Sequence, residues 1–267
     1  MFTLGSDPEL LLVNAQGKYI SSVELIGGSK TAPRKTAHGY VQEDNVLVEF
    51  NTDPASNKEE FITNTLNMIQ DINEIIVPLD LSVRIESSGL FDQDQLQSDQ
   101  ANIAGCEADY DAWEMVENFP PDLGETNLRT CGGHLHIAFD QAEEDQYNRA
   151  YMTRVMDLLA GIPSVLMDND IQRRTLYGKA GAHRPKFVQN GDAYNGVEYR
   201  TLSNFWLRSV KHIGWAYSTV ERAVNHLDEL RRIADAESSL IQQAINTSNQ
   251  GIAEKLVMKY DLEVVYA

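Results

Sequence analysis

The sequence predicts an α+β fold, in which helices pack on one face of an antiparallel sheet. Alternating apolar and polar runs between turn residues, typical of half-buried strands, fill residues 1–54 and recur in the middle of the chain. Apolar residues spaced three or four apart, typical of helices, occur between these runs and dominate residues 205–259. We therefore expect one domain over residues 1–267, with a sheet core over 1–204 and a helical tail over 205–267.

The first expected elements are strands. Residues 10–13 and 18–21 flank a turn at Ala15-Gln16-Gly17, which predicts a β-hairpin. Residues 45–51 (NVLVEFN) have a short strand pattern, and residues 81–86 alternate apolar with polar side chains in the same way.

A helix is expected between these strands, over residues 56–76. Ser56 and Glu59 have the spacing of a capping box, and an apolar stripe follows at Ile62, Leu66, Ile69, Ile72 and Ile76. Residues 91–128 are irregular, acidic and contain proline. Such a length is unusual for a plain connection, so we interpret this segment as a substrate loop or lid.

The second half of the chain begins with a strand at residues 134–139 (HLHIAF). A helix is expected to start at Asp140, with an apolar face that extends to Leu159. Residues 168–196 are rich in Gly, Asn and Arg and are expected to form a loop, and residues 196–202 (GVEYRTL) another strand.

The composition excludes several classes of protein. Hydrophobic residues make up 42% of the chain, enough for a substantial core, but no window approaches eighteen apolar residues, and we expect no membrane span. The net charge of −18 opposes binding to a phosphate backbone, so no nucleic-acid partner is expected. The N-terminus lacks the basic and apolar regions of a secretory signal. Cys106 and Cys131 form no C-x-x-C pair, which indicates buried thiols in a reducing compartment.

Asp7 and Glu9 are the first candidate metal ligands. In an extended chain, two acids two residues apart point to the same side, where they can hold Mg²⁺ or bridge two ions. Gly-Ser-Asp-Pro is also strong turn chemistry, and a plain turn remains the alternative. Glu49 lies on one face of the strand at 45–51, where an ordinary solvent-facing acid is the alternative.

His134 and His136 are the second candidate pair. They follow Gly132-Gly133 and share one face of a strand, which suits a shared metal or a metal beside a phosphate. A structural role for each histidine is equally compatible with the pattern. On the last strand, Glu198 and Arg200 share a face, so that Glu198 could hold a cation and Arg200 a phosphate oxygen, or the two could form an ion pair. Together these strands predict an oxygen-rich site for Mg²⁺ or Mn²⁺.

In the same order, these motifs resemble the carboxylate-amine ligase superfamily of glutamine synthetase and glutamate-cysteine ligase. The runs GSDPE, GGHLHI and EYRTLSNFW are similar to the COOH-NH2 ligase type 2 branch of phiEco32-like phages. The resemblance covers residues 4–215 and leaves the helical tail without a counterpart. It implies the antiparallel sheet of this superfamily, an ATP- and Mg²⁺-dependent ligase, and a location in the cytoplasm, or the host cytoplasm for a phage protein.

The resemblance also implies roles for single residues. Glu9 and Glu49 would hold one Mg²⁺, and Asp7, His134 and Glu198 a second. Asp7 departs from the larger relatives, which have glutamate at this position. His136 would lie near the nucleotide, and Arg200 would contact the phosphoryl group during its transfer. A basic loop would contact ATP or the acyl-phosphate through Arg173, Arg174, Lys179 and Arg184.

The implied reaction transfers a phosphoryl group from ATP to a carboxylate, and an amine then attacks the acyl-phosphate. The substrates would be small molecules or peptides. Asp109, Asp111 and Trp113 are candidates to bind the amine, with an acidic surface loop anchored by the tryptophan as the alternative, and Asn51 is a further substrate candidate. An oligomer is compatible with the apolar tail. A metal-dependent amidase or peptidase, and a non-catalytic binding module on the same fold, remain alternative functions.

Overall fold

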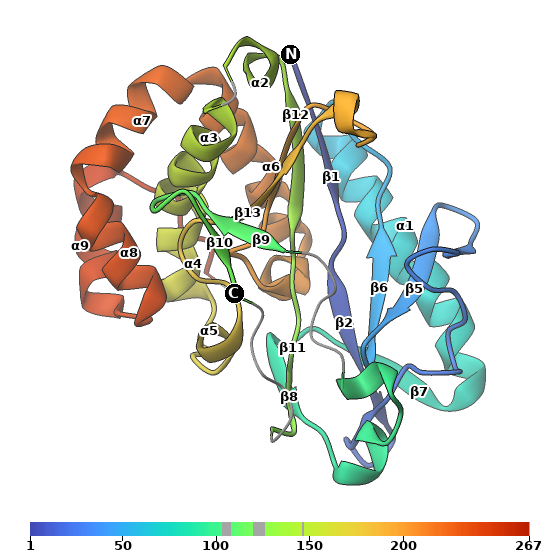
Figure 1. Ribbon diagram of the computed structural model, residues 1–267. Helices are drawn as coiled ribbons and strands as arrows, with labels where there is room; N and C mark the ends of the chain where they lie inside the picture. Colours follow the sequence, from blue (N-terminus) through green and yellow to red (C-terminus); the bar gives the residue numbers. More distant parts are fainter. Residues whose placement is uncertain (103–107, 120–125, 146, 267) are drawn as a thin grey trace.

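The computed structural model describes residues 1–102, 108–119, 126–145 and 147–266. Strands β1 and β2 follow one another almost without interruption and carry the chain from one sheet into a second one (Figure 1). Asp7 and Pro8 occupy the short junction between them. Every strand pairing in the described residues is antiparallel, which confirms the predicted fold class.

The first sheet has the strand order β1-β12-β14-β13-β9-β10. Its strands are β1 (Phe2–Ser6), β9 (Asp109–Asp111), β10 (Val116–Asn118), β12 (Leu135–Phe139), β13 (Ala182–Lys186) and β14 (Gly196–Tyr199). His136 lies opposite Glu198 in the β12–β14 pairing, and Arg184 lies opposite Glu198 in the β13–β14 pairing. The register therefore brings three of the predicted site residues into one row across the sheet.

The second sheet has the order β3-β2-β6-β5-β4, with β7 also paired to β2. Its strands are β2 (Glu9–Asn14), β3 (Tyr19–Ile20), β4 (Arg34–Lys35), β5 (Tyr40–Asp44), β6 (Leu47–Asn51) and β7 (Leu81–Arg84). A separate small ribbon pairs β8 (Ser88–Leu90) with β11 (Leu128–Thr130). Glu9 and Glu49 are direct cross-strand partners between β2 and β6.

The helices pack against the sheets and bury one large apolar core. The α-helices are α1 (Lys58–Ile76), α2 (Gln141–Glu144), α3 (Asn148–Met156), α4 (Ile162–Met167), α5 (Arg173–Leu176), α6 (Val210–Asn225), α7 (Leu227–Ala236), α8 (Ser238–Asn246) and α9 (Gln250–Tyr260). On β12, the side chains of Leu135, Ile137 and Phe139 point into this core. His136, between them, and His134, directly before the strand, therefore face the opposite side of the sheet. The C-terminal helices lie beside α3 and α4, on the side away from β5 and β6 (Figure 1).

Most of the predicted elements are confirmed, with three corrections. The cap of α1 is Asn57, whose side chain accepts a hydrogen bond from the Glu60 N–H, so the capping pair is shifted by one residue from the predicted Ser56 and Glu59. The predicted helix that starts at Asp140 is broken into α2, α3, a π-helical turn at Asp157–Gly161, and α4.

The third correction concerns residues 168–196, which do not form only a loop. They contain α5 and β13, and the proline at position 185 hid the strand from the sequence pattern. The proposed lid over residues 91–128 lies partly outside the described residues, as does Cys106. The described part contains β9 and β10, and Cys131 is buried as expected. No helix among the described residues is long and apolar enough to cross a membrane.

Candidate active site

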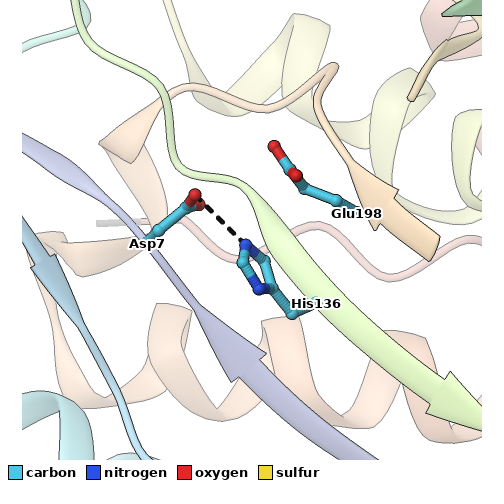
Figure 2. Close-up of side chains that lie close together, drawn as sticks. All are labelled: Asp7, His136 and Glu198. Atoms are coloured by element: carbon cyan, nitrogen blue, oxygen red, sulfur yellow. Dashed lines mark ion pairs between the residues drawn. The ribbon is translucent and has the colours of Figure 1, made fainter. Parts of the chain in front are cut away.

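Asp7 lies at the junction of the two sheets, where side chains from both can reach it. Its Oδ1 atom is 3.2 Å from His134 Nδ1. Its Oδ2 atom is 3.1 Å from His136 Nε2, the ion pair drawn in Figure 2. Because β1 pairs with β12, and β12 with β14, Glu198 is placed beside the same imidazoles. Asp7, His136 and Glu198 each offer a ligand atom within 4.8 Å of the others, and we call these three residues the histidine cluster.

A second group, the acid cluster, consists of Glu9, Asp44 and Glu49. Their carboxylate oxygens also lie within 4.8 Å of one another. Glu9 and Glu49 come from paired strands, and Asp44 comes from β5, which pairs with β6 on its other side. The Gly132 N–H donates to Glu9 Oε2 at 2.5 Å, and Lys30 Nζ lies 3.4 Å from Asp44 Oδ2.

Within the acid cluster, the pKa values of Glu9 and Glu49 are raised. Burial, the nearby Asp44 carboxylate and then Asp7 raise the pKa of Glu9 to about 7, against the opposing donor at Gly132. Burial, followed by repulsion from Asp7, Asp44 and Glu9, raises the pKa of Glu49 well above its usual range. The cluster therefore favours the binding of positive charge, either as protons or as a divalent cation.

The histidine cluster has the opposite balance. Burial alone would raise the pKa of Asp7, but His136 and His134 hold it well below its usual range. Burial also opposes ionisation of Glu198, whose pKa Arg200, His136 and Arg184 nevertheless hold far below its usual range. Burial lowers the pKa of His136, but the negative charge of Asp7 stabilises the imidazolium, and the pKa of His136 is raised as a result. The pKa of His134 is lowered by burial and by Arg200.

Basic side chains converge on Glu198. Arg184 Nη1 lies 3.3 Å from its Oε1 atom, Lys186 Nζ lies 3.2 Å from Oε2, and Arg200 Nη1 donates to Oε1. Arg200 also donates from Nε to Asp109 Oδ2 at 3.2 Å. Arg200 thus connects β14 to β9, and both arginines lie at the edge of the same site.

Both clusters fit divalent cations on grounds independent of any similarity. Three buried or half-buried carboxylates with mutual repulsion are the donor set that Mg²⁺ and Mn²⁺ prefer. In the histidine cluster, Asp7 Oδ1 and His136 Nε2 are buried without a hydrogen-bond partner among the described residues, although each lies at ion-pair distance from its neighbour. Buried polar atoms of this kind are costly unless a ligand completes them.

A cavity of about 110 Å³ lies beside these groups. Acidic residues Asp7, Glu9, Asp44, Glu49 and Asp109 line it together with Arg184, Arg200 and the loop at Tyr177 and Gly178. It is small and mixed in charge, which suits one end of a polar substrate.

Some predicted residues lie away from the cavity or have structural contacts. Arg173 is 3% exposed and donates to the carbonyls of Cys131, Thr201 and Leu202, which holds the ends of β11 and β14 together, although it lines the cavity wall. Arg174 is buried and donates to Ser164 and Ser248, on the helical side. The Lys179 side chain is exposed, and neither Arg174 nor Lys179 lines the cavity.

Of the residues predicted to bind the substrates, some line the cavity and others make structural contacts away from it. Asp109 lines the cavity and pairs with Arg200. Asp111 Oδ1 accepts hydrogen bonds from the backbone N–H groups of Trp113 and Glu114, as in a turn, and Trp113 Nε1 donates to the buried Asp157 at 2.7 Å. Asn51 is half-buried at the end of β6 and does not line the cavity.

Three residues of the site escaped the sequence analysis. Their sequence segments look like ordinary polar surface. Strand pairing brings Asp44 and Lys186 to the clusters, and Lys30 reaches Asp44 from a turn. The one signal that could have found Asp44 is its position at the end of a strand, directly before a turn at Asn45 and a buried strand.

Glycines 132 and 133 stand where other parts of the chain leave no room for a side chain. A Cβ atom at Gly132 would lie 2.3 Å from His134 Nε2, and one at Gly133 would lie 2.3 Å from the Ser203 carbonyl oxygen. They therefore make room for the His134 ring and for the backbone at Ser203.

No protein-family model and no curated protein matches the chain. A solved structure of a bifunctional glutathione synthetase from Pasteurella multocida is similar over 98% of this chain and 47% of its own, with 13% identity and a TM-score of 0.47. A glutamine synthase homologue is similar over 98% of this chain and 68% of its own, with 11% identity and a TM-score of 0.39. The chain thus spans about half the length of the glutathione synthetase. Both similarities are weak, so function is argued from the residues of the chain itself.

Proposed function

We propose that the chain is an ATP- and Mg²⁺-dependent ligase that joins a carboxylate to an amine, on an amino acid or peptide. The observation that carries this proposal is the placement of two cation-binding clusters side by side, at Asp7 and Glu9, with Arg184 and Arg200 at their edge. A polyphosphate with bound divalent ions needs this combination of carboxylates and guanidinium groups. The motif resemblance to the phage ligase branch supports the same proposal.

Each part of the site then has a task. The acid cluster would hold one divalent ion and the histidine cluster a second, with His134 as a further ligand beside Asp7. Such ions would neutralise negative charge on the phosphates. Arg200 and Arg184 would stabilise charge on a transferring phosphoryl group, and Asp109 would accept the proton of the attacking amine.

ATP turnover by the purified protein tests the proposal. We expect ADP release with Mg²⁺ that depends on an amine from a mixture of amino acids and cell-wall peptides. His134→Ala and Glu198→Ala should abolish it. His226→Ala and Glu229→Ala are matched controls, because these exposed residues form an ion pair with each other at 3.9 Å at the start of α7; both should retain full turnover.

The two alternatives give different results in the same assay. A metal-dependent amidase or peptidase would bind Mn²⁺ and cleave amides without nucleotide. A binding module would bind neither nucleotide nor metal productively. Absence of ATP binding with both Mg²⁺ and Mn²⁺ would exclude the ligase.

A further inference from the structure

Of the basic side chains predicted to contact the nucleotide, Arg184 reaches the histidine cluster, 3.3 Å from Glu198, whereas Arg173 and Arg174 do not. The Arg173 guanidinium is saturated by backbone carbonyls, and Arg174 lies on the helical side. Two further polar side chains reach the cluster from another segment, the hairpin between β13 and β14. This hairpin begins at Lys186, ends at Gly196, and contains Tyr194.

Lys186 and Tyr194 approach the cluster from this hairpin. Lys186 Nζ lies 3.2 Å from Glu198 Oε2 and 4.0 Å from Asp192 Oδ1. The Tyr194 ring packs against the His136 ring, with 6.0 Å between their centroids. Hydrogen bonds from the Phe187 N–H to Asp192 and from the Val188 N–H to Asn195 fix the hairpin, so both side chains are held in place.

The Tyr194 hydroxyl oxygen is buried without a hydrogen-bond partner among the described residues, as are the neighbouring His136 Nε2 and Asp7 Oδ1. A buried hydroxyl without a partner is destabilising, so the Tyr194 hydroxyl indicates a ligand beside the cluster that completes it. Asp7 Oδ1 and His136 Nε2 would be completed by the divalent cation. The Lys186 ammonium and the Tyr194 phenol O–H are donors, so the ligand that complements them beside this cation carries anionic oxygens.

Charge indicates the same ligand. Four carboxylates, Asp7, Asp109, Asp192 and Glu198, face three cations, Arg184, Arg200 and Lys186, in the protein alone. A divalent cation at the cluster would leave excess positive charge and would compete with Lys186 for Glu198. Lys186 would then be available for an anion bound to that cation.

We propose that Lys186 and Tyr194 are the side chains that bind the polyphosphate chain of the nucleotide beside the histidine cluster. This inference rests on the proposed function and replaces the predicted role of the loop at residues 173–179. Tyr194 donates its hydroxyl to a phosphate oxygen, and Lys186 pairs with another. Neither residue forms part of the wall of the 110 Å³ cavity, which Arg184 and Arg200 line.

The test measures binding of ATP and of tripolyphosphate in the presence of Mn²⁺, by titration calorimetry, for wild type and three variants. Tyr194→Phe keeps the ring packed on His136 and should weaken both ligands about tenfold. Lys186→Met should weaken both by about ten- to a hundredfold. Mn²⁺ alone should bind both variants at least as tightly as wild type. Lys179→Met is the matched control in the loop and should bind both ligands as wild type does.

The outcomes separate the two proposals. If wild type binds Mn²⁺ but neither polyphosphate, the ligase proposal fails, and this inference with it. If wild type binds both ligands and only Lys179→Met weakens them, the ligase proposal stands and the hairpin assignment is wrong. A loss confined to ATP in the Tyr194 and Lys186 variants would place these residues against the base or ribose, which also contradicts a phosphate contact. Melting temperatures of all variants check that each is folded.

Discussion

Glu9 shows how a single residue joins the two halves of the site. It is the first residue of β2, it pairs with Glu49 across the second sheet, and its carboxylate accepts the Gly132 N–H that precedes the histidines of β12. Its position is therefore fixed by both sheets. Burial and the acids around it raise its pKa to about 7, so Glu9 retains a proton near neutral pH that a bound cation would displace.

Metal affinity is expected to depend on pH through Glu9. Since its pKa is about 7 in the protein without metal, a divalent cation must displace a proton below that pH. Mn²⁺ should therefore bind roughly tenfold more weakly at pH 6 than at pH 8 for this one proton. Calorimetric titration at pH 6, 7 and 8 measures this.

Glu9→Gln is the control for this pH dependence. It should weaken Mn²⁺ binding and flatten its dependence across pH 7. An unchanged pH dependence in Glu9→Gln would show that another group carries the proton.

Glu49 provides a second prediction at this scale. Burial and three neighbouring carboxylates raise its pKa well above its usual range, which favours the neutral form of Glu49 in the protein without metal. Glu49→Gln copies this neutral form and should leave the melting temperature unchanged or slightly higher. It should abolish most of the stabilisation that saturating Mn²⁺ gives to the wild type. Thermal melting with and without Mn²⁺ checks both parts, and a large loss of stability without metal would contradict this account.

At the scale of elements, the cap of α1 illustrates how local hydrogen bonding overrides a motif. Both Ser56 and Asn57 can begin a helix, but Asn57 adopts the extended cap conformation and accepts the Glu60 N–H at 2.9 Å. The Glu60 side chain in turn accepts the Ser56 N–H at 2.8 Å. The reciprocal pair is therefore made with the backbone of Ser56 and not with its hydroxyl.

Substitutions at these two positions should therefore differ. Asn57→Ala should lower the free energy of unfolding by about 1 kcal/mol, because it leaves the Glu60 N–H without its acceptor. Ser56→Ala should change it by less than about 0.5 kcal/mol, as expected at an exposed site. Chemical denaturation measures both, and equal losses would restore the predicted cap at Ser56.

The π-helical turn between α3 and α4 places the buried Asp157 carboxylate behind β14. Tyr199 and Thr201 donate to its Oδ1 atom at 2.8 and 3.0 Å, and Trp113 and Gly181 donate to Oδ2 at 2.7 and 2.6 Å. Tyr199 and Thr201 flank Arg200, so this network fixes the strand that presents Arg200 to the site.

Asp157→Asn should therefore be strongly destabilising. An amide cannot accept all four hydrogen bonds, and it directs its own N–H groups at existing donors, so the loss should be roughly 2–4 kcal/mol. Asp235→Asn removes an exposed carboxylate that pairs with Arg154 and should cost less than about 1 kcal/mol. Denaturant titration of both variants measures the difference, and similar small losses would exclude a structural role for Asp157.

At the scale of the whole molecule, the two sheets meet along β1 and β2 and leave one face to the site while the helices cover the core. The carboxylates of the acid cluster contribute to the net charge of −18 and repel one another. A divalent cation bound between them would relieve this repulsion, whereas a monovalent salt only screens it.

Divalent cations should therefore raise the melting temperature beyond any effect of ionic strength. At a hundredfold excess over the dissociation constant, binding to the native state contributes about 2.7 kcal/mol. ATP should raise it further only when Mg²⁺ is present. NaCl at matched ionic strength is the control; an equal shift with NaCl would mean that screening, and not site binding, stabilises the protein.

The sequence by itself determined the fold class and the candidate strands of the site. Alternation places Glu198 and Arg200 on one face of their strand, and His134 and His136 on one face of theirs. Side chains alternate in this way along every strand, whatever its neighbours are. The helical tail follows equally from its periodicity. Local rules of this kind need no knowledge of which strands pair.

Only the tertiary structure decided which residues meet. Strand order and register bring Asp44 and Lys186 to the clusters, and Lys30 reaches Asp44 from a turn. No local pattern distinguishes these residues from surface charge. Tertiary contacts likewise place Arg174 on the helical side and turn Trp113 towards Asp157. The physical reason is that these contacts join residues far apart in the chain, and their energies depend on burial and on partners that only the folded sheets provide.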